Sequence, residues 1–298
     1  MQVEKLKTID ADTLLSTPMR KTLFVVDGLI PQGLSVLSGS SKIGKSWLML
    51  WLGIQVARGQ PVWEFETHKN DVLYLCLEDT YARIQSRLYQ ITDEAPPELR
   101  IATTSFQIGN GLEQQIEQYL SDFPKTKLVI IDTFQKVRDS KSTGGKSGMY
   151  AGDYDDVSAL KNISDKYGIA VMVVHHVRKL KDVSDPFNEV SGSTGITGAA
   201  DTNFVLKRSR ANETGTLLAT GRDIAYQELT LKFDNRSHLW ELVERKDMED
   251  IHREEIPRFI FRLVDYISEV KDWRGTATQL ITQVNETEVT PNVVTKML

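Results

Sequence analysis

The 298-residue sequence has one cysteine and no long apolar run, and each absence excludes a class of protein. Cys76 lies within the apolar stretch 72–77, so there is neither a disulfide framework nor a C-x-x-C metal site, and the thiol is expected in the core. No segment approaches the roughly 18 apolar residues that span a bilayer, and residues 1–20 are too polar for a signal peptide. We therefore expect a soluble, cytoplasmic protein.

Basic residues are not in excess either. The formal net charge is −5 and the isoelectric point is near 5.7, which excludes a uniformly basic nucleic-acid coat, although local basic loops can still carry phosphate contacts. The sequence shows no internal repeat and no zinc or primase motif. Its length fits one α/β domain of about 250 residues with a small appendage.

The most specific motif is a glycine-rich loop between an apolar run and a helical segment. Residues 39–46 fit G-x-x-x-x-G-K-[ST], after the apolar run 34–38. Such a loop points its backbone N–H groups at phosphates, and the next helix adds its positive end. Lys45 would reach the β- and γ-phosphates, and the Ser46 hydroxyl would take one Mg²⁺ position. The predicted ATP-binding residues are Gly39, Ser40, Ser41, Lys42, Ile43, Gly44, Lys45, Ser46 and Trp47.

Apolar runs typical of buried parallel strands alternate with segments of helical periodicity. Strands are expected at 34–38, 72–77, 128–131 and 170–174, and helices at 45–58, 81–91, 112–120 and 157–167. This alternation predicts βαβ units and an α/β fold with a mostly parallel sheet. An antiparallel extension at one sheet edge is expected from shorter strands at 203–206, 216–220, 228–233 and 239–242.

A charged segment, 244–250, separates this core from a helical tail, so we expect one domain over 1–245 and a smaller region over 246–298. Tail helices are expected at 259–270, 277–284 and 290–298. Three helices in this order resemble the front half of a winged-helix domain, with 291–298 as recognition helix. The sequence stops at Leu298, where a wing would begin, which indicates a bare three-helix bundle or a truncated domain. DNA binding and a packing or oligomerisation role fit the tail equally well.

Polar residues end three of the expected strands. Asp132, after an apolar run, would hold Mg²⁺ through its water shell. Glu78 would polarise the attacking water, with Asp79 as the alternative, although acidic residues here could also simply cap the next helix. One histidine of the pair 175–176 would hydrogen-bond the γ-phosphate, and His176 is the better candidate because it lies nearer the basic loop that follows.

Together, the P-loop, Glu78, Asp132 and the His-His-x-x-Lys motif at 175–179 resemble the RecA-like ATPases, and most closely the RepA-type hexameric replicative helicases of plasmids, phages and mobile elements. The resemblance covers residues 22–242, and Lys42 within the P-loop is typical of the phage and mobile-element members. It implies a homo-oligomeric, hexameric ring that hydrolyses ATP with Mg²⁺ at subunit interfaces. Single-stranded DNA would lie in the channel, and a replication initiator or a primase would be a partner.

By position, the loops that would contact DNA are 134–153 and 177–199, which are long and basic. The expected DNA contacts are Lys136, Arg138, Lys141, Arg178, Lys179 and Lys181.

The resemblance also implies an arginine supplied by the neighbouring subunit to the γ-phosphate. Arg208 and Arg210 resemble the Lys-x-Arg finger of DnaB-type helicases, although the RepA-type finger falls earlier on this strand, near the non-basic Phe204. Arg222 is the alternative, and a solvated strand end would explain any of these arginines equally well.

Two other functions fit the same motifs. One is a nucleotide-switched DNA-binding or loader protein that does not unwind DNA, and the other is a RecA-type recombination or repair ATPase that forms filaments. The basic, glycine-containing loops and the absence of an N-terminal polymerisation domain favour a ring over a filament. Nothing in the sequence separates a helicase from a loader.

Overall fold

The computed structural model describes residues 6–19, 21–138, 146–176, 187, 194–209, 212–285 and 289–297. It divides into two compact units, Met1–Arg245 and Lys246–Leu298. Within the described residues, no helix is both long enough and apolar enough to cross a bilayer.

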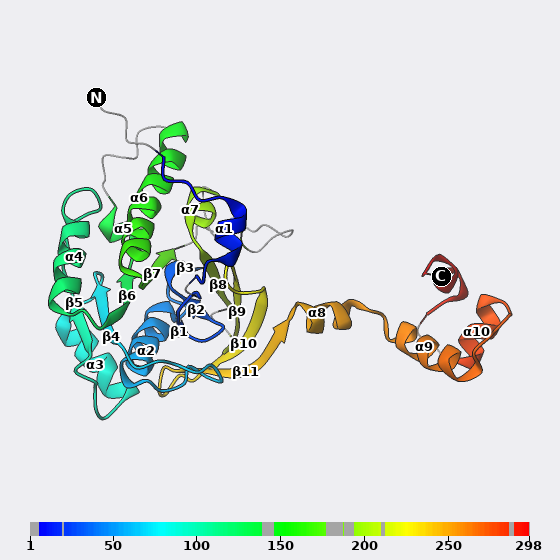
Figure 1. The fold of residues 1–298 in the computed structure, drawn as a ribbon. Coiled ribbons are helices and arrows are strands. Elements are labelled where there is room, and N and C mark those ends of the chain that lie inside the picture. Colours follow the sequence, from blue (N-terminus) through cyan, green and yellow to red (C-terminus); the bar gives the residue numbers. More distant parts are fainter. Residues whose placement is uncertain are drawn as a thin grey trace. The chain divides into compact units, whose positions relative to one another are not determined.

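The larger unit is built on a nine-stranded sheet in the order β11-β10-β9-β8-β3-β7-β6-β4-β5, with a separate two-stranded ribbon, β1-β2 (Figure 1). The strands are β1 (Phe24–Val26), β2 (Ile30–Pro31), β3 (Gly33–Gly39), β4 (Asp71–Cys76), β5 (Leu99–Ala102), β6 (Thr126–Asp132), β7 (Ala170–His176), β8 (Thr202–Arg208), β9 (Thr214–Gly221), β10 (Gln227–Phe233) and β11 (Trp240–Asp247). Strands β8, β3, β7, β6, β4 and β5 are parallel, whereas β9 is antiparallel to β8 and to β10. The expected α/β class, with a mostly parallel sheet and an antiparallel edge, is confirmed.

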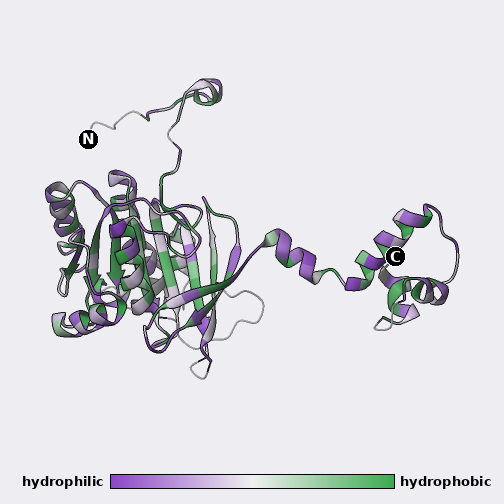
Figure 2. Ribbon diagram, turned by 90° about the horizontal axis from the view of Figure 1, so that it is seen from below, coloured by the Kyte–Doolittle hydropathy of each residue, from purple (hydrophilic) through white to green (hydrophobic). Residues whose placement is uncertain are grey.

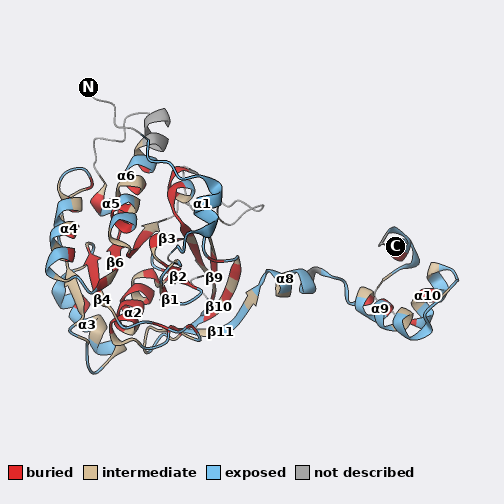
Figure 3. Ribbon diagram, in the orientation of Figure 1, coloured by how far each residue is buried: buried red, intermediate tan, exposed pale blue. Residues whose placement is uncertain are grey.

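Helices cover both faces of the parallel region, which explains why its strands are apolar runs. The helices are α1 (Ala11–Ser16), α2 (Lys45–Arg58), α3 (Tyr81–Ile91), α4 (Leu112–Asp122), α5 (Phe134–Val137), α6 (Lys146–Tyr167) and α7 (Thr194–Ala199). Alternate strand residues pack against α2 and α3 on one face and against α4 to α7 on the other. Figure 2 shows the resulting apolar strands, and Figure 3 shows that they are buried between exposed outer helix faces.

Some sequence expectations change in the structure. The predicted loop 134–153 is wrong in part: it contains α5 and the first turns of α6, and residues 139–145 lie outside the described residues. In the predicted loop 177–199, only Phe187 and helix α7 are described. Strand β5 was not expected, because the short sequence Leu99–Ala102 lacks a continuous apolar run and is only half-buried.

The smaller unit consists of helices α8 (Met248–Glu255), α9 (Arg258–Val270), α10 (Ala277–Gln283) and α11 (Pro291–Met297). Its core is formed by Phe259, Leu263, Leu280, Val284 and Val294. Within the charged segment 244–250, where the two units meet in the sequence, β11 runs to Asp247, and the Asp247 side chain forms a capping box at the start of α8.

Candidate nucleotide-binding and hydrolysis site

The candidate site lies at the carboxyl ends of the parallel strands, where ligands of open α/β sheets bind. Strands β3 and β7 are in register so that Gly39 lies beside His176. Strands β4 and β6 bring Cys76 beside Asp132 in the same way. The P-loop, the predicted Mg²⁺ carboxylate Asp132 and the predicted γ-phosphate partner His176 are therefore close together, because their strands are adjacent.

Side chains from the antiparallel strands of the sheet pack against the P-loop. Gly44 has φ 105°, a conformation that favours glycine, and it directly precedes α2. A Cβ at Gly44 would lie 3.0 Å from Trp240 Nε1 and 3.2 Å from Phe233 Cε2, so a side chain there would crowd both rings. Trp240 is 1% exposed, and its indole N–H donates a hydrogen bond of 3.2 Å to the Gly44 carbonyl. The loop thus rests on two aromatic rings.

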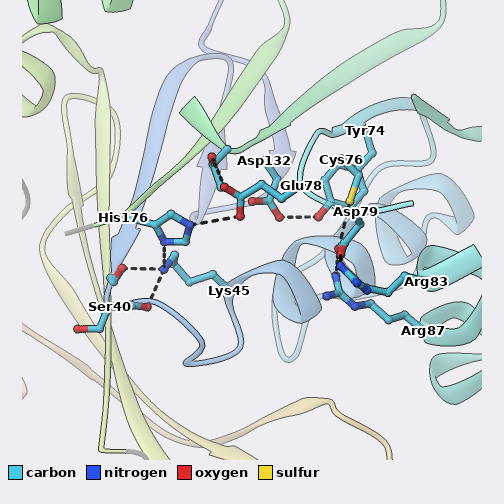
Figure 4. A network of polar contacts seen from close by, with 12 residues as sticks. Ser40, Lys45, Tyr74, Cys76, Glu78, Asp79, Arg83, Arg87, Asp132 and His176 are labelled. Carbon is cyan, nitrogen blue, oxygen red and sulfur yellow. Dashed lines mark hydrogen bonds and ion pairs between the residues drawn. The ribbon is translucent and has the colours of Figure 1, made fainter. Parts of the chain in front are cut away.

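Lys45 is buried and held by the P-loop itself (Figure 4). Its Nζ donates to the carbonyl oxygens of Gly39 and Ser40, at 2.6 and 2.8 Å, and lies 3.1 Å from His176 Nδ1. Burial lowers the pKa of Lys45 to about 8, against the raising effect of Asp132 and Glu78, so the side chain is largely protonated at pH 7. An ammonium only donates, so His176 accepts through Nδ1 and carries its own proton on Nε2.

Asp132 provides a site for a hard cation. It is 3% exposed, and its Oδ2 accepts a hydrogen bond of 2.9 Å from the Tyr74 hydroxyl. Burial raises the pKa of Asp132, while hydrogen bonds from Ser46 and Tyr74 oppose that shift. A hydroxyl and a carboxylate joined in this way fit Mg²⁺, which takes few protein oxygens and keeps several waters. Among the described residues, no larger group of His, Cys, Asp or Glu side chains could hold a metal.

The structure distinguishes the two adjacent carboxylates that the sequence left open. The Asp79 side chain is 8% exposed and forms ion pairs with both Arg83 and Arg87. The Glu78 side chain is 47% exposed, and its Oε2 lies 3.7 Å from His176 Nε2 (Figure 4). Asp79 is therefore paired with two arginines of α3, whereas the Glu78 carboxylate is accessible from the cleft.

These groups line a cleft of about 760 Å³, a size suited to a small ligand. One end carries Glu78, Asp132 and His176. The other end is aromatic: Trp47 stacks on His238 at 4.2 Å between ring centroids, beside Phe233. The guanidinium of Arg87 lies 5.2 Å from the centre of the Trp47 ring, so a cation covers its face. The cleft thus has a polar end, which is the predicted hydrolytic end, and an aromatic end.

The other predicted site residues fall into three groups. Lys136 is exposed on α5, but Arg138 is not the exposed loop cation that we expected: its side chain is 11% exposed and forms ion pairs with Asp153 and Asp156 on α6. Arg208 lines the cleft, and Arg222 is 64% exposed and lies near Asp201. Arg210, Lys141, Arg178, Lys179 and Lys181 lie outside the described residues.

At the aromatic end, sequence reasoning predicted a role for Trp47 alone, and it assigned none to Phe233, His238, Trp240 or Tyr74. No local sequence motif predicts that Phe233, His238 or Trp240 belongs to the site, because these residues reach the P-loop only through the pairing of the antiparallel strands. The clustering of aromatic residues between 233 and 240 was the only signal available.

A family profile described as an AAA domain matches residues 2–182, more than half of the sequence. The chain belongs to the AAA domain family. No curated protein matches it.

Many solved structures have a similar fold, and two of them illustrate the likeness. The first, described as an ATPase domain, aligns with a TM-score of 0.59 and 14% identity, over 72% of this chain and 85% of that one. A DnaB-like replicative helicase, described with its interactions with primase, aligns with a TM-score of 0.60 and 14% identity, over 76% of this chain but only 63% of the other. At this identity the likeness shows the fold alone, an α/β core built on a mostly parallel sheet.

Proposed function

We propose that this AAA protein is an ATP-hydrolysing, DNA-stimulated, ring-forming motor of the RepA helicase type, acting on single-stranded DNA in the replication of a plasmid, phage or mobile element. The observation that carries the proposal is the hydrolytic end of the cleft, where Lys45, Glu78 and His176 form one chain of polar contacts beside Asp132.

The contacts suggest how these side chains act. When ATP binds, the three donors of Lys45 turn from their present acceptors to the β- and γ-phosphates. Glu78 orients a water and takes its proton as the water oxygen bonds to the γ-phosphorus and the bond to the β-phosphate oxygen breaks. Ser46 and Asp132 would hold Mg²⁺, which supplies charge neutralisation to the phosphates.

His176 is placed to report the state of the γ-phosphate. It lies between Lys45 and Glu78 and is the last residue before the basic segment 177–181. Release of Lys45 to the phosphates frees Nδ1 of His176, so its hydrogen bonding differs between the empty and the ATP-bound site. We propose that this difference links hydrolysis to the DNA-contacting segment. A ring with DNA in its channel, and a primase or initiator as partner, completes the proposal.

The test is an unwinding assay on a forked DNA duplex with a single-stranded tail, run with ATP and Mg²⁺ and with Lys45→Ala as the matched inactive variant. We expect strand separation and DNA-stimulated ATP turnover by the wild type, and neither by the variant. Nucleotide binding and DNA binding without unwinding would instead identify a loader. Near-normal turnover by Lys45→Ala would refute the site itself.

A further inference from the structure

Arg208 lies in the nucleotide cleft of its own subunit, although the sequence led us to expect a residue that acts on a neighbour. It ends β8, which pairs with β3 so that Val205 lies opposite Ser38. The Leu206 carbonyl oxygen is so close to Gly39 that a Cβ there would lie 2.6 Å from it. Arg208, two residues further on, therefore flanks the start of the P-loop on the side away from β7 and His176.

Two aromatic rings contact the Arg208 guanidinium, which lines the same cleft as the P-loop. Its Cζ lies 4.3 Å from the centre of the Phe233 ring and 5.4 Å from that of Trp240. Its Nε donates a hydrogen bond of 2.8 Å to the Asn212 carbonyl. The same two rings pack against Gly44, so they contact both the P-loop and this cation.

The charge of Arg208 is not matched within the described part of the chain. Arg83 and Arg87, the other arginines of the cleft, both form ion pairs with Asp79. Arg208 contacts two rings and one carbonyl, and no carboxylate of the described residues pairs with it. A guanidinium held in this way uses only its Nε–H within the described residues, so its other N–H groups can bind a phosphate through two parallel hydrogen bonds.

We propose that Arg208 binds the α,β-diphosphate of the nucleotide held by its own P-loop, an inference that rests on the proposed ATPase function. Arg208 lies at the aromatic end of the cleft, away from the hydrolytic group Glu78 and Asp132. The diphosphate is present in both ATP and ADP and is not transferred, so a contact to it contributes mainly to nucleotide affinity and little to the rate of the chemical step.

The experiment measures binding of mant-ADP, a fluorescent ADP, by full-length Arg208→Met, which keeps an apolar stem over the two rings and removes the charge. We expect the Kd to rise about tenfold to a hundredfold, the effect of losing a charged hydrogen bond. The KM for ATP should rise in parallel while kcat at saturating ATP keeps the wild-type value. Arg208→Lys, which retains the charge, should recover part of the affinity. Lys232→Met is the matched control, because Lys232 is exposed on β10 next to Phe233 but alternates to the other face.

A second arm separates action within a subunit from action across an interface. Arg208→Met subunits are mixed with Lys45→Ala subunits at limiting ATP, where the Arg208→Met defect is large. Both defects lie in a subunit's own site, so mixing should give no more activity than the two variants measured separately. Gain of activity on mixing, or a lowered kcat with unchanged mant-ADP affinity, would overturn the inference and make Arg208 a finger for the neighbour. A wild-type chain that binds no mant-ADP would instead defeat the proposed function.

Discussion

At the scale of single residues, the environment divides the roles of two adjacent carboxylates. The Asp79 side chain is buried, and each of its two oxygens pairs with an arginine of α3, so both oxygens already have a partner. Glu78 is half-exposed at the cleft, with its nearest contacts to Thr133 and His176. The sequence offered both residues for the same role, and only their contacts distinguish them.

We therefore expect Glu78→Gln to keep ATP affinity and to lower kcat by about 10²–10⁴-fold, because the amide cannot take a proton in the transition state. Stopped-flow binding of mant-ATP and steady-state phosphate release measure the two quantities. Asp79→Asn is the matched control: it frees the two arginines and should alter nucleotide affinity more than kcat. The assignment is wrong if Asp79→Asn abolishes turnover while Glu78→Gln hydrolyses ATP normally.

His175, beside the sensor histidine, should make stability depend on pH. Burial lowers the pKa of His175 to about 4, and its ring lies edge-on to Phe134 at 5.9 Å between centroids. Between pH 4 and the unfolded value near 6.5, the unfolded chain binds the proton and the folded chain does not, so stability falls as the pH falls through this window. From pH 7 to pH 5 this residue should cost about 2 kcal/mol.

Urea unfolding of His175→Gln at both pH values checks this, since the variant should lose that part of the pH dependence. His68→Gln, at an exposed histidine, is the control and should behave as the wild type. An unchanged pH dependence in His175→Gln would show that the ring titrates normally in the folded protein.

At the scale of elements, the parallel core could be predicted because burial on both faces makes each strand an apolar run, and each motif follows a strand end. The contact between Trp240 and the P-loop could not be predicted, since Trp240 lies 196 residues from Gly44 in the sequence and contacts it only because the strands pair. The ion pairs of Arg138 could not be predicted either. Its partners Asp153 and Asp156 lie within α6, and part of that segment was predicted to be a glycine-containing loop.

Segment 177–181 follows β7 in the sequence, and β7 ends with His176 at the candidate site. Replacing Arg178, Lys179 and Lys181 together by glutamine should remove DNA stimulation and leave basal ATP turnover intact. The logarithm of DNA affinity should also depend less steeply on the logarithm of salt concentration, by about 2 for three lost contacts to single-stranded DNA.

The matched control replaces Lys69, Lys125 and Lys166 by glutamine. Lys69 and Lys125 lie just before β4 and β6, and Lys166 lies near the end of α6, so all three are remote in the sheet from the strand ends that carry the site. This control should keep both the stimulation and the salt slope. Unchanged stimulation in the 178–181 variant would exclude the segment from DNA contact.

At the scale of the whole molecule, the described part of the chain contains the residues that we propose bind the nucleotide and activate water, but it offers no unpaired arginine that we place at the γ-phosphate. Arg83 and Arg87 are paired with Asp79, and we place Arg208 at the diphosphate. A heterologous, head-to-tail interface would bring an arginine from the next subunit to this position and would close into a ring where the rotation allows. Arg210 and Arg222 are the two candidates.

The prediction is that Arg210→Ala subunits and Lys45→Ala subunits, each inactive alone, regain partial ATPase activity when mixed. Some interfaces would then join an intact P-loop from one variant to an intact finger from the other, whereas the pairing of Arg208→Met with Lys45→Ala offers no such interface. The same mixing with Arg222→Ala tests the second arginine. Specific activity should also fall on dilution, because a shared site is lost when subunits separate. Activity that stays strictly proportional to protein at concentrations where only monomers remain would contradict the shared site, whichever arginine is tested.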